Sequence, residues 1–384
     1  MHTEVGYQQR VPIVASARPL IGASGRTQVR LCAATLRVRA NTQPLAEGRL
    51  SLLPKLMLIT PTFHGYGQSI ARGFECAGYE IAVHEYDRLD AMAAKVRHKL
   101  TVELPAKLHL RPEKGVAAGA EAAAAIRAHK PAIVLILRGD NISEEVFDAI
   151  DEVGAKRILW LWDEVRRTNH TEESLSRFPQ LITYSPLDAE AFLADGRECI
   201  HVANAFDHTM VPDHPRHTSN VLFVGARYPR REALVQELVL GGVPVTAVGR
   251  TWSKHVVDRL RTWQWQRPDV HAMRDVPRAE GYAMTAGAPA ALNIHFDQDG
   301  FTMKTFEAPG VGGVQLIDRP DIDAYYEPGT EVLVYESAEE LVELAQRCID
   351  DDRWGDAIRR AGQRRTLAEH TFVHRAKEVA KLWA

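Results

Sequence analysis

The chain has 384 residues, of which 45% are hydrophobic and 25% are charged, so it can form two domains that each have a core. A net charge of −3, without a basic stripe interleaved with aromatic side chains, argues against nucleic acid as a partner held by charge. Charged residues interrupt every apolar segment, so the sequence predicts no membrane span. The cysteines, Cys32, Cys76, Cys199 and Cys348, lack the paired spacing of a zinc site or a disulfide framework, which suits a reducing cytoplasm.

Residues 1–55 differ from the rest of the chain in composition. Seven arginines stand against two acidic residues, and the segment shows little periodicity and no long apolar core of a secretory signal. We expect this extension to be mostly disordered and dispensable. It resembles a transit peptide, but translated sequence upstream of a true start at Met57 is the interpretation we favour, since Met57 lies in the first predicted strand.

Residues 56–206 are predicted to form the first domain, because short apolar runs alternate there with helical patterns. The predicted strands cover residues 56–60, 80–84, 131–137, 157–162, 181–184 and 200–202. The predicted helices cover residues 68–77, 113–129 and 187–194. Alternating strands and helices imply a parallel sheet covered on both faces, so we expect a Rossmann-like domain.

A polar linker containing two prolines, residues 207–220, is followed by a second domain over residues 221–365 and a C-terminal helix over residues 366–384. Strands are predicted over residues 221–224, 243–248, 290–294, 314–317 and 331–335. Helices are predicted over residues 231–240, from 302 onward, and over 338–350 and 353–370. The predicted fold class is therefore α/β, with two Rossmann-like domains facing each other across a cleft at the carboxyl ends of their strands.

Two acidic residues, Asp299 and Glu307, surround a predicted turn from strand to helix in the second domain. The helix that starts at Thr302 presents free backbone N–H groups and a partial positive charge, which favour an anion such as a diphosphate. Lys304 opposes the helix dipole in the first turn, so it suits phosphate binding better than helix stability. A solvated turn before a charged helix is the alternative.

This stretch resembles the acid-x7-acid signature of retaining glycosyltransferases with the GT-B fold, here Asp299-x7-Glu307. Residues 292–295, 304–308 and 312–313 resemble more closely the C-terminal half of the CgeB-like (spore maturation) proteins, among the glycosyl transferases of group 1. The segments 326–329, 338–341, 361–362 and 370–375 continue that pattern in order. The resemblance extends from Met57 to the C-terminus and is most specific after residue 220. It departs from the pattern in the shorter acid at position 299 and in Pro309, which removes a hydrogen bond from the predicted helix.

The resemblance implies a glycosyltransferase that moves a sugar from a nucleotide-sugar donor in the second domain to an acceptor in the first. It implies retention of configuration, with Glu307 bonded to the donor ribose and Asp299 near the transferred sugar. Arg227 or Arg230, together with Lys304, is expected to hold the diphosphate. Four further residues are predicted around the donor: Gly225, Gly300, Phe301 and Thr302. No resident cofactor is expected. The acceptor, whether a glycan, a small molecule or a protein, is not identified, and a modified base is not excluded.

Three arginines, Arg227, Arg230 and Arg231, follow Gly225 at the end of the first strand of the second domain. Arginine offers a planar fork that binds phosphate through two hydrogen bonds, and the end of a strand places it at the cleft. The sequence does not show which of the three binds phosphate, and a solvated turn is again the alternative.

The loop at residues 60–67 follows the first strand of the first domain. Gly65 and Gly67 let the backbone approach a ligand closely, and His64 is a candidate acceptor contact or general base. A loop histidine that is merely hydrogen-bonded fits equally well. The two glycines also half-match a dinucleotide fingerprint, although Ile70 occupies the third glycine position. The alternatives are therefore an NAD(P)-dependent oxidoreductase, a nucleotide-sugar epimerase of the same fold, and a catalytically silent sugar-nucleotide-binding protein.

Two further motifs have weaker interpretations. Asp297 and Asp299 form an Asp-x-Asp pair that is able to chelate a divalent cation, but they follow a late strand and basic residues nearby can neutralise a diphosphate, so we predict no metal site. Trp160 and Trp162 end a strand of the first domain, where they either stack on an acceptor or pack in the core. Residues 271–276 are predicted, from position alone, as a loop around the nucleobase.

Overall fold

The computed structural model describes residues 53–87 and 118–383. Almost all of the predicted N-terminal extension lies outside this part of the chain, as does the beginning of the helix predicted over residues 113–129.

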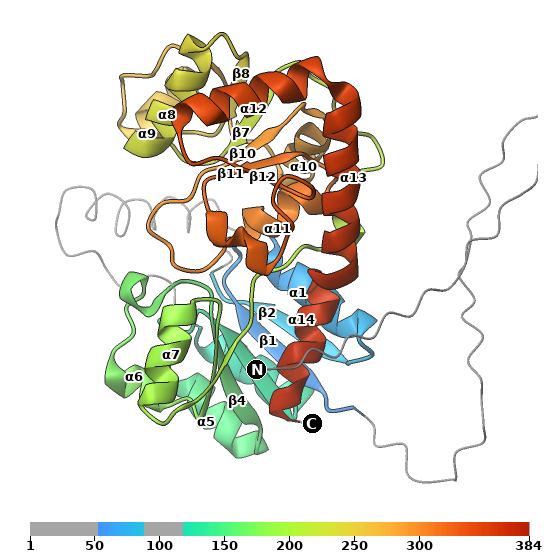
Figure 1. Ribbon diagram of the computed structural model, residues 1–384. Coiled ribbons are helices and arrows are strands. Elements are labelled where there is room, and N and C mark those ends of the chain that lie inside the picture. Colours follow the sequence, from blue (N-terminus) through green and yellow to red (C-terminus); the bar gives the residue numbers. More distant parts are fainter. Residues whose placement is uncertain (1–52, 88–117, 384) are drawn as a thin grey trace, which may run out of the picture. The chain divides into compact units, whose positions relative to one another are not determined.

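The N-terminal lobe has a six-stranded parallel sheet with the strand order β2-β1-β3-β4-β5-β6 (Figure 1). Its strands are β1 (Leu56–Thr60), β2 (Ile81–Glu85), β3 (Ile133–Leu137), β4 (Lys156–Leu161), β5 (Gln180–Thr183) and β6 (Glu198–His201). Its helices are α1 (Tyr66–Cys76), α4 (Ala120–His129), α5 (Glu144–Val153), α6 (Glu172–Ser176) and α7 (Pro186–Ala194). Strands β1 and β3 are buried throughout and are apolar except for Thr60 at the end of β1, because helices cover both faces of a parallel sheet. Met57 and Ile59 pack in the cluster with α4 and α5, whereas Leu56 and Leu58 pack in the cluster with α1.

The C-terminal lobe repeats this plan with the strand order β12-β11-β10-β7-β8-β9, again parallel. Its strands are β7 (Val221–Val224), β8 (Val245–Val248), β9 (His271–Met273), β10 (Ala291–Asn293), β11 (Gln315–Ile317) and β12 (Leu333–Val334). Its helices are α8 (Pro229–Leu240), α9 (Val256–Thr262), α10 (Arg278–Gly287), α11 (Met303–Gly310), α12 (Ala338–Asp350) and α13 (Asp352–Glu369). Strands β7 and β10 are neighbours although they are not consecutive, so the strand order reverses between them. Open α/β sheets bind ligands at the carboxyl ends of the strands at such a reversal.

The end of the chain returns from the C-terminal lobe to the N-terminal lobe. Helix α13 runs to Glu369, and α14 (Phe372–Val379) then packs against α1 (Figure 1). A Cβ atom at Gly73 of α1 would lie 2.6 Å from the backbone of Phe372, so the close approach of these two helices requires glycine there. The C-terminal segment predicted from residue 366 thus begins with the last turn of α13.

The predicted α/β class with two parallel sheets is confirmed, and every predicted strand is present to within two residues at each end. The prediction of a nucleobase loop at residues 271–276 is wrong in part, because β9 pairs there with β8. Helices α5, α6, α9 and α10 were not predicted. Gly281 and Gly287 weaken the helical pattern of α10, whereas α5 has a clear apolar face and was predictable from it.

Pro309 lies in the last turn of α11, where it does not disrupt the helix. A proline lacks the N–H group that would bond to the carbonyl four residues earlier, which is that of Thr305. The side-chain amide of Gln315 donates to this carbonyl at 3.3 Å, and its own oxygen accepts from Asn293 at 3.0 Å. The fold therefore satisfies the group that the proline leaves free, and Glu307 stays on a regular helix.

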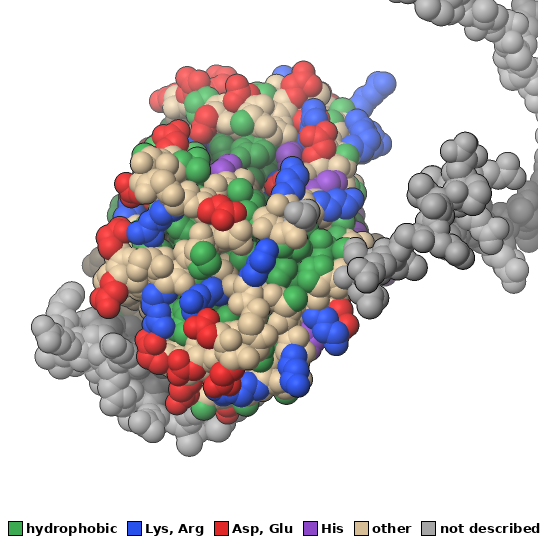
Figure 2. All heavy atoms as spheres, turned by 90° about the horizontal axis from the view of Figure 1, so that it is seen from below, with side chains coloured by type: hydrophobic (Ala, Val, Ile, Leu, Met, Phe, Trp, Pro, Cys, Tyr) green, Lys and Arg blue, Asp and Glu red, His purple; other side chains and the backbone are tan. Residues whose placement is uncertain are grey.

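On the face in Figure 2, basic and acidic side chains of the described residues are intermixed. Among the helices of the described part, none is long and apolar enough to cross a membrane.

Candidate active site

Glu307 is the buried centre of a polar cluster between the two lobes, with 7% of its surface exposed. Its Oε1 atom accepts hydrogen bonds from the hydroxyls of Tyr66, on α1, and Tyr282, on α10; the second bond is 2.6 Å long. Burial raises the pKa of both tyrosines well above the usual value, and the charge of Glu307 adds to this effect. Both hydroxyls therefore stay protonated and donate to the same oxygen, while the other carboxylate oxygen, Oε2, accepts no hydrogen bond from a described residue.

Arg278 and Trp162 surround Tyr66. The guanidinium of Arg278 lies 4.5 Å from the ring centre of Tyr66 and donates to Ser69 at 2.6 Å, so it also joins the two lobes. The indole of Trp162 meets the ring of Tyr66 edge to face at 5.2 Å. The Nη1 atom of Arg278 and the Nε1 atom of Trp162 are buried and have no hydrogen-bond partner among the described residues. Unpaired buried donors are costly, so both atoms mark a place where an oxygen-rich ligand would be favourable.

Lys304 lies close enough to both Glu307 and Arg231 for their charges to act on its ammonium. Burial lowers the pKa of Lys304; Glu307 opposes this effect and Arg231 adds to it. No described residue forms an ion pair with the Lys304 ammonium. Arg231 donates to the carbonyl of Ile294 at 3.0 Å and to that of Ala226 at 3.2 Å, so it lies between the ends of β10 and β7, where the strand order reverses. Helix α11 begins there without an acidic residue or a side-chain cap in its first turn, so its N–H groups add to an anion-binding environment.

The other two candidate arginines bond to side chains of the protein, whereas Arg231 bonds to backbone carbonyls. Arg227 bonds to Glu232 at 3.2 Å and to Gln264 at 3.0 Å. Arg230 forms an ion pair with Asp318 and donates to the carbonyl of His295 at 2.9 Å. Arg231 is thus the arginine that the structure brings to Lys304.

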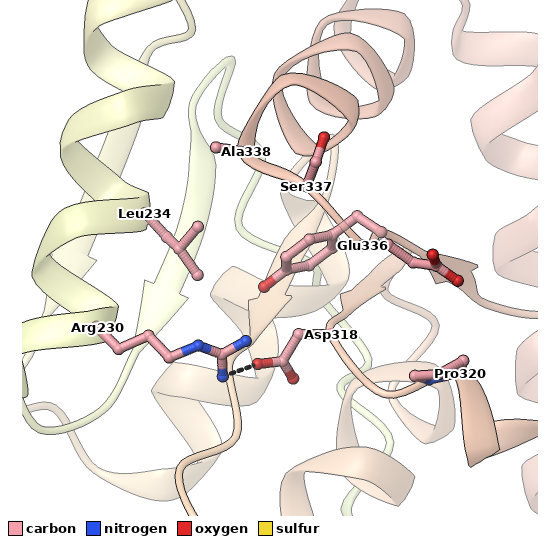
Figure 3. Close-up of a pocket in the computed structure, with 8 residues that line it drawn as sticks. Arg230, Leu234, Asp318, Pro320, Glu336, Ser337 and Ala338 are labelled. Carbon is pink, nitrogen blue, oxygen red and sulfur yellow. Dashed lines mark hydrogen bonds and ion pairs between the residues drawn. The ribbon is translucent and has the colours of Figure 1, made fainter.

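Figure 3 shows the ion pair of Arg230 in the wall of a pocket of about 420 Å³. The Asp318 side chain is buried there and also bonds to His295 at 3.0 Å. Burial alone would raise the pKa of Asp318, but its bonds to His295 hold that pKa below the usual range. The hydroxyl of Tyr335, which also lines the pocket, is buried without a partner among the described residues. A phosphate would have to compete with Asp318 for Arg230.

Asp299 points to the N-terminal lobe and not to Glu307. Its carboxylate accepts from the Ser185 hydroxyl at 2.5 Å and from the Leu187 N–H at 3.1 Å, at the start of α7. Burial alone would raise the pKa of Asp299, but these hydrogen bonds outweigh it and hold the pKa below the usual range. The backbone N–H of Asp299 also donates to Glu164 at 3.3 Å. Asp299 and Glu307 therefore lie just before and within the same helix, α11, but they have no hydrogen-bond partner in common.

Asp297 is also engaged by the N-terminal lobe. Arg166 pairs with its carboxylate at 3.0 Å, and Arg167 forms a second ion pair with it. Among the described residues, no group of three or more His, Cys, Asp or Glu side chains could hold a metal ion.

Two of the candidate glycines, Gly67 and Gly300, are required by close packing within the protein itself. A Cβ atom at Gly67 would lie 2.6 Å from the Thr60 side chain, and one at Gly300 would lie 2.3 Å from the carbonyl of Tyr184 in the other lobe. Gly65 adopts a left-handed φ of 71° just before α1. The prediction that Gly65 and Gly67 give a ligand close access to the backbone therefore has a competing structural explanation.

The remaining candidates lie around the same loops. His64 is exposed beside Phe63, without a hydrogen bond to a described residue. Phe301 is buried, and its carbonyl accepts from Asn204 of the N-terminal lobe at 2.9 Å. Thr302 precedes α11, and its side chain makes no capping bond. Gly225 lies at the end of β7, next to the Arg231 guanidinium.

Sequence reasoning missed Tyr66, Tyr282 and Arg278 as members of the site. Arg278 and Tyr282 are four residues apart and therefore share one face of α10. This spacing was available as a signal, but no helix had been predicted at that place. Nothing local in the sequence connects Tyr66 to Glu307, because 241 residues separate them.

Comparison with known proteins agrees with this geometry. Residues 230–381 match the model of a family described as glycosyl transferase-like. The spore protein CgeB of Bacillus subtilis is 21% identical over 272 residues, which cover 66% of this chain and 83% of CgeB. The structure of Anabaena HepE in complex with UDP and glucose superimposes with a TM-score of 0.56 at 14% identity, covering 86% of this chain and 99% of HepE. The T4 phage β-glucosyltransferase in complex with UDP-glucose gives a TM-score of 0.51 at 11% identity, covering 85% and 98%.

The two parallel sheets and the superpositions show that the chain has the GT-B fold, and residues 230–381 form a glycosyl transferase-like domain. The match of this domain and the similarity to CgeB support the resemblance found in the sequence to the CgeB-like proteins.

Proposed function

We propose that the protein transfers a sugar from a UDP-sugar to an acceptor, with the donor in the C-terminal lobe. The observation that carries this proposal is the position of Lys304 in the first turn of α11, where the charges of both Arg231 and Glu307 act on it, at the reversal of strand order. Two cations and a helix start suit a diphosphate, and a buried carboxylate suits a ribose hydroxyl. UDP is chosen because the structures of HepE and of the T4 phage enzyme hold UDP or UDP-glucose.

The chemistry follows from this placement. As the bond from the sugar to the diphosphate breaks, negative charge grows on the leaving UDP, and Lys304 and Arg231 stabilise it more in the transition state than in the ground state. Asp299 remains the proposed acid nearest the transferred sugar, although it must give up Ser185 to reach it. Retention of configuration is proposed from the acid-x7-acid signature alone.

We propose that this reaction needs no metal ion. Two cations are present to neutralise the diphosphate, and the Asp297 carboxylate is already paired with Arg166 and Arg167. Donor turnover should therefore persist in EDTA. Complete loss in EDTA that Mn²⁺ restores would instead identify Asp297 and Asp299 as a chelate.

The function is tested by thermal shift and turnover with a panel of nucleotide sugars. UDP and at least one UDP-sugar should raise the melting temperature, because a ligand that binds only the folded state stabilises it. That UDP-sugar should release UDP slowly in water and faster with a suitable acceptor. Stabilisation by NAD(P) without any effect of UDP, or conversion of the donor to an epimer without transfer, would overturn the proposal.

A further inference from the structure

The Glu307 carboxylate is held asymmetrically. Both tyrosine hydroxyls donate to Oε1, one from each lobe, and no described residue donates to Oε2. Hydrogen bonds to an ionised carboxylate are shorter and stronger than bonds between neutral groups, so two of them on one atom fix the plane of the carboxylate.

A competitor for this carboxylate lies one turn away. Lys304 precedes Glu307 by three residues on α11, so the two side chains share a face of the helix and their charges attract. If Glu307 formed an ion pair with Lys304, the ammonium would no longer be available for phosphate. The carboxylate would also lose its orientation. The two tyrosines oppose this collapse, because they hold Glu307 from the side of the N-terminal lobe and of α10.

We propose that Tyr66 is a positioning residue that acts across the lobes. With Tyr282 it turns Glu307 so that Oε2 receives a ribose hydroxyl of the donor while Lys304 stays free for the diphosphate. This inference rests on the proposed function. Because Tyr66 belongs to α1, the donor site is complete only while the N-terminal lobe contacts the C-terminal lobe, and donor binding favours that contact.

The experiment is a thermodynamic cycle in which one hydroxyl is removed from the protein, one from the ligand, and then both together. Affinities of UDP, 2′-deoxy-UDP and 3′-deoxy-UDP are measured by titration calorimetry for the full chain and for Tyr66→Phe. In the unmodified protein, loss of the hydroxyl that meets Oε2 should weaken binding about ten- to a hundredfold, as expected for a hydrogen bond to a charged group. In Tyr66→Phe, UDP should bind several-fold more weakly, and the same deoxy substitution should cost less than about threefold, since coupled groups are not additive.

Two variants separate positioning from folding. Tyr326→Phe removes another fully buried tyrosine hydroxyl, which is bonded to Thr366 at 2.8 Å and not to Glu307, and should leave the affinities for UDP and for both deoxy nucleotides unchanged. Tyr282→Phe removes the second donor to Oε1 and should act like Tyr66→Phe, so it serves if the latter fails to fold.

The outcomes distinguish the two levels of the proposal. A full deoxy penalty in both tyrosine variants would overturn the positioning role and leave the proposed function standing. No penalty for either deoxy nucleotide in the unmodified protein, with UDP still bound, would remove Glu307 from the ribose and also overturn the positioning role, whereas the proposed function fails only if UDP does not bind.

Discussion

Lys304 occupies a position where a helix gains nothing from a cation. A positive side chain in the first turn opposes the helix dipole at a cost of about 0.3–1 kcal/mol, and burial lowers its pKa as well. No acidic residue shares that first turn, and Glu307 is bound to two tyrosines. Lys304 thus costs the helix stability and forms no ion pair with a described residue. A negatively charged ligand best explains its presence.

Replacing Lys304 by methionine should therefore lower kcat for donor turnover by about two to three orders of magnitude, because it removes a group that stabilises the leaving diphosphate. Folding stability should stay equal or rise slightly, since the opposing charge is gone. Arg227→Ala is the matched control, because this arginine has two protein partners, and its kcat should change less than about threefold. Equal losses in the two variants would contradict the assignment.

Glu307 allows affinity to be separated from stability. Glu307→Gln keeps an oxygen for Tyr66 and Tyr282, so it should fold normally but bind UDP about ten- to a hundredfold more weakly. Glu307→Ala leaves both hydroxyls buried without an acceptor and should also lose about 1–3 kcal/mol of unfolding free energy. Calorimetric titration and urea unfolding measure the two quantities. Unchanged UDP affinity in the glutamine variant would remove Glu307 from the donor site.

The sequence predicted Glu307 and Lys304 because their signal is local: an apolar strand, a turn and a helix start within one short stretch. It could not rank Arg227, Arg230 and Arg231, since the choice depends on which partners the fold supplies to each. It assigned no role to Tyr66, because the contact with Glu307 arises only when two sheets meet.

At the scale of elements, strands were easier to predict than helices. Buried parallel strands are continuous apolar runs, which stand out in the sequence, whereas α10 contains two glycines and α9 has only seven residues. Pro309 shows the opposite case. This proline predicted an irregular α11. In the structure, the side-chain amide of Gln315, on β11, donates to the carbonyl that the missing N–H leaves free.

The junction of α13 and α14 should make stability depend on pH. His370 lies there, 6% exposed, between the carbonyl of Tyr325 at 3.0 Å and Arg375 at 3.2 Å. Burial is the main cause that lowers the pKa of His370 to about 4. The unfolded chain then binds more protons than the folded one between about pH 6.5 and 4, so stability is complete above this window and falls as the pH falls.

Urea unfolding at pH 7 and pH 5 tests this coupling. His370 should account for a loss of about 2 kcal/mol between the two pH values, whereas His370→Gln should lose correspondingly less. The comparison removes the contribution of carboxylates, which both proteins share. Parallel losses in the two proteins would show that His370 is protonated equally in the folded and unfolded states.

At the scale of the whole molecule, the sequence predicted two Rossmann-like halves but not what joins them. Several candidate residues of the second domain contact the N-terminal lobe: Asp297, Asp299, Gly300, Phe301 and Glu307. The loop between β10 and α11 therefore has a second task beside the donor, which is to connect the lobes. A local sequence pattern cannot show which residues of the two lobes contact each other, because each pattern depends only on the strands and helices of its own lobe.

The ion pairs of Asp297 should tune this connection without setting the stability of the fold. Arg166 and Arg167 are both partly exposed, so each pair is worth about 0.2–1 kcal/mol and is weakened by salt. In the double variant Arg166→Ala/Arg167→Ala, the lobes should separate more readily, and KM for the donor should rise about fivefold, which corresponds to about 1 kcal/mol. The melting temperature should fall as well, because Arg167 also pairs with the buried Glu164 at 2.8 Å. High salt should narrow the difference in KM from the unmodified protein. Arg177→Ala/Arg197→Ala removes two arginines paired within the N-terminal lobe and is the matched control. The same rise in KM in both double variants would attribute the effect to net charge and not to the junction of the lobes.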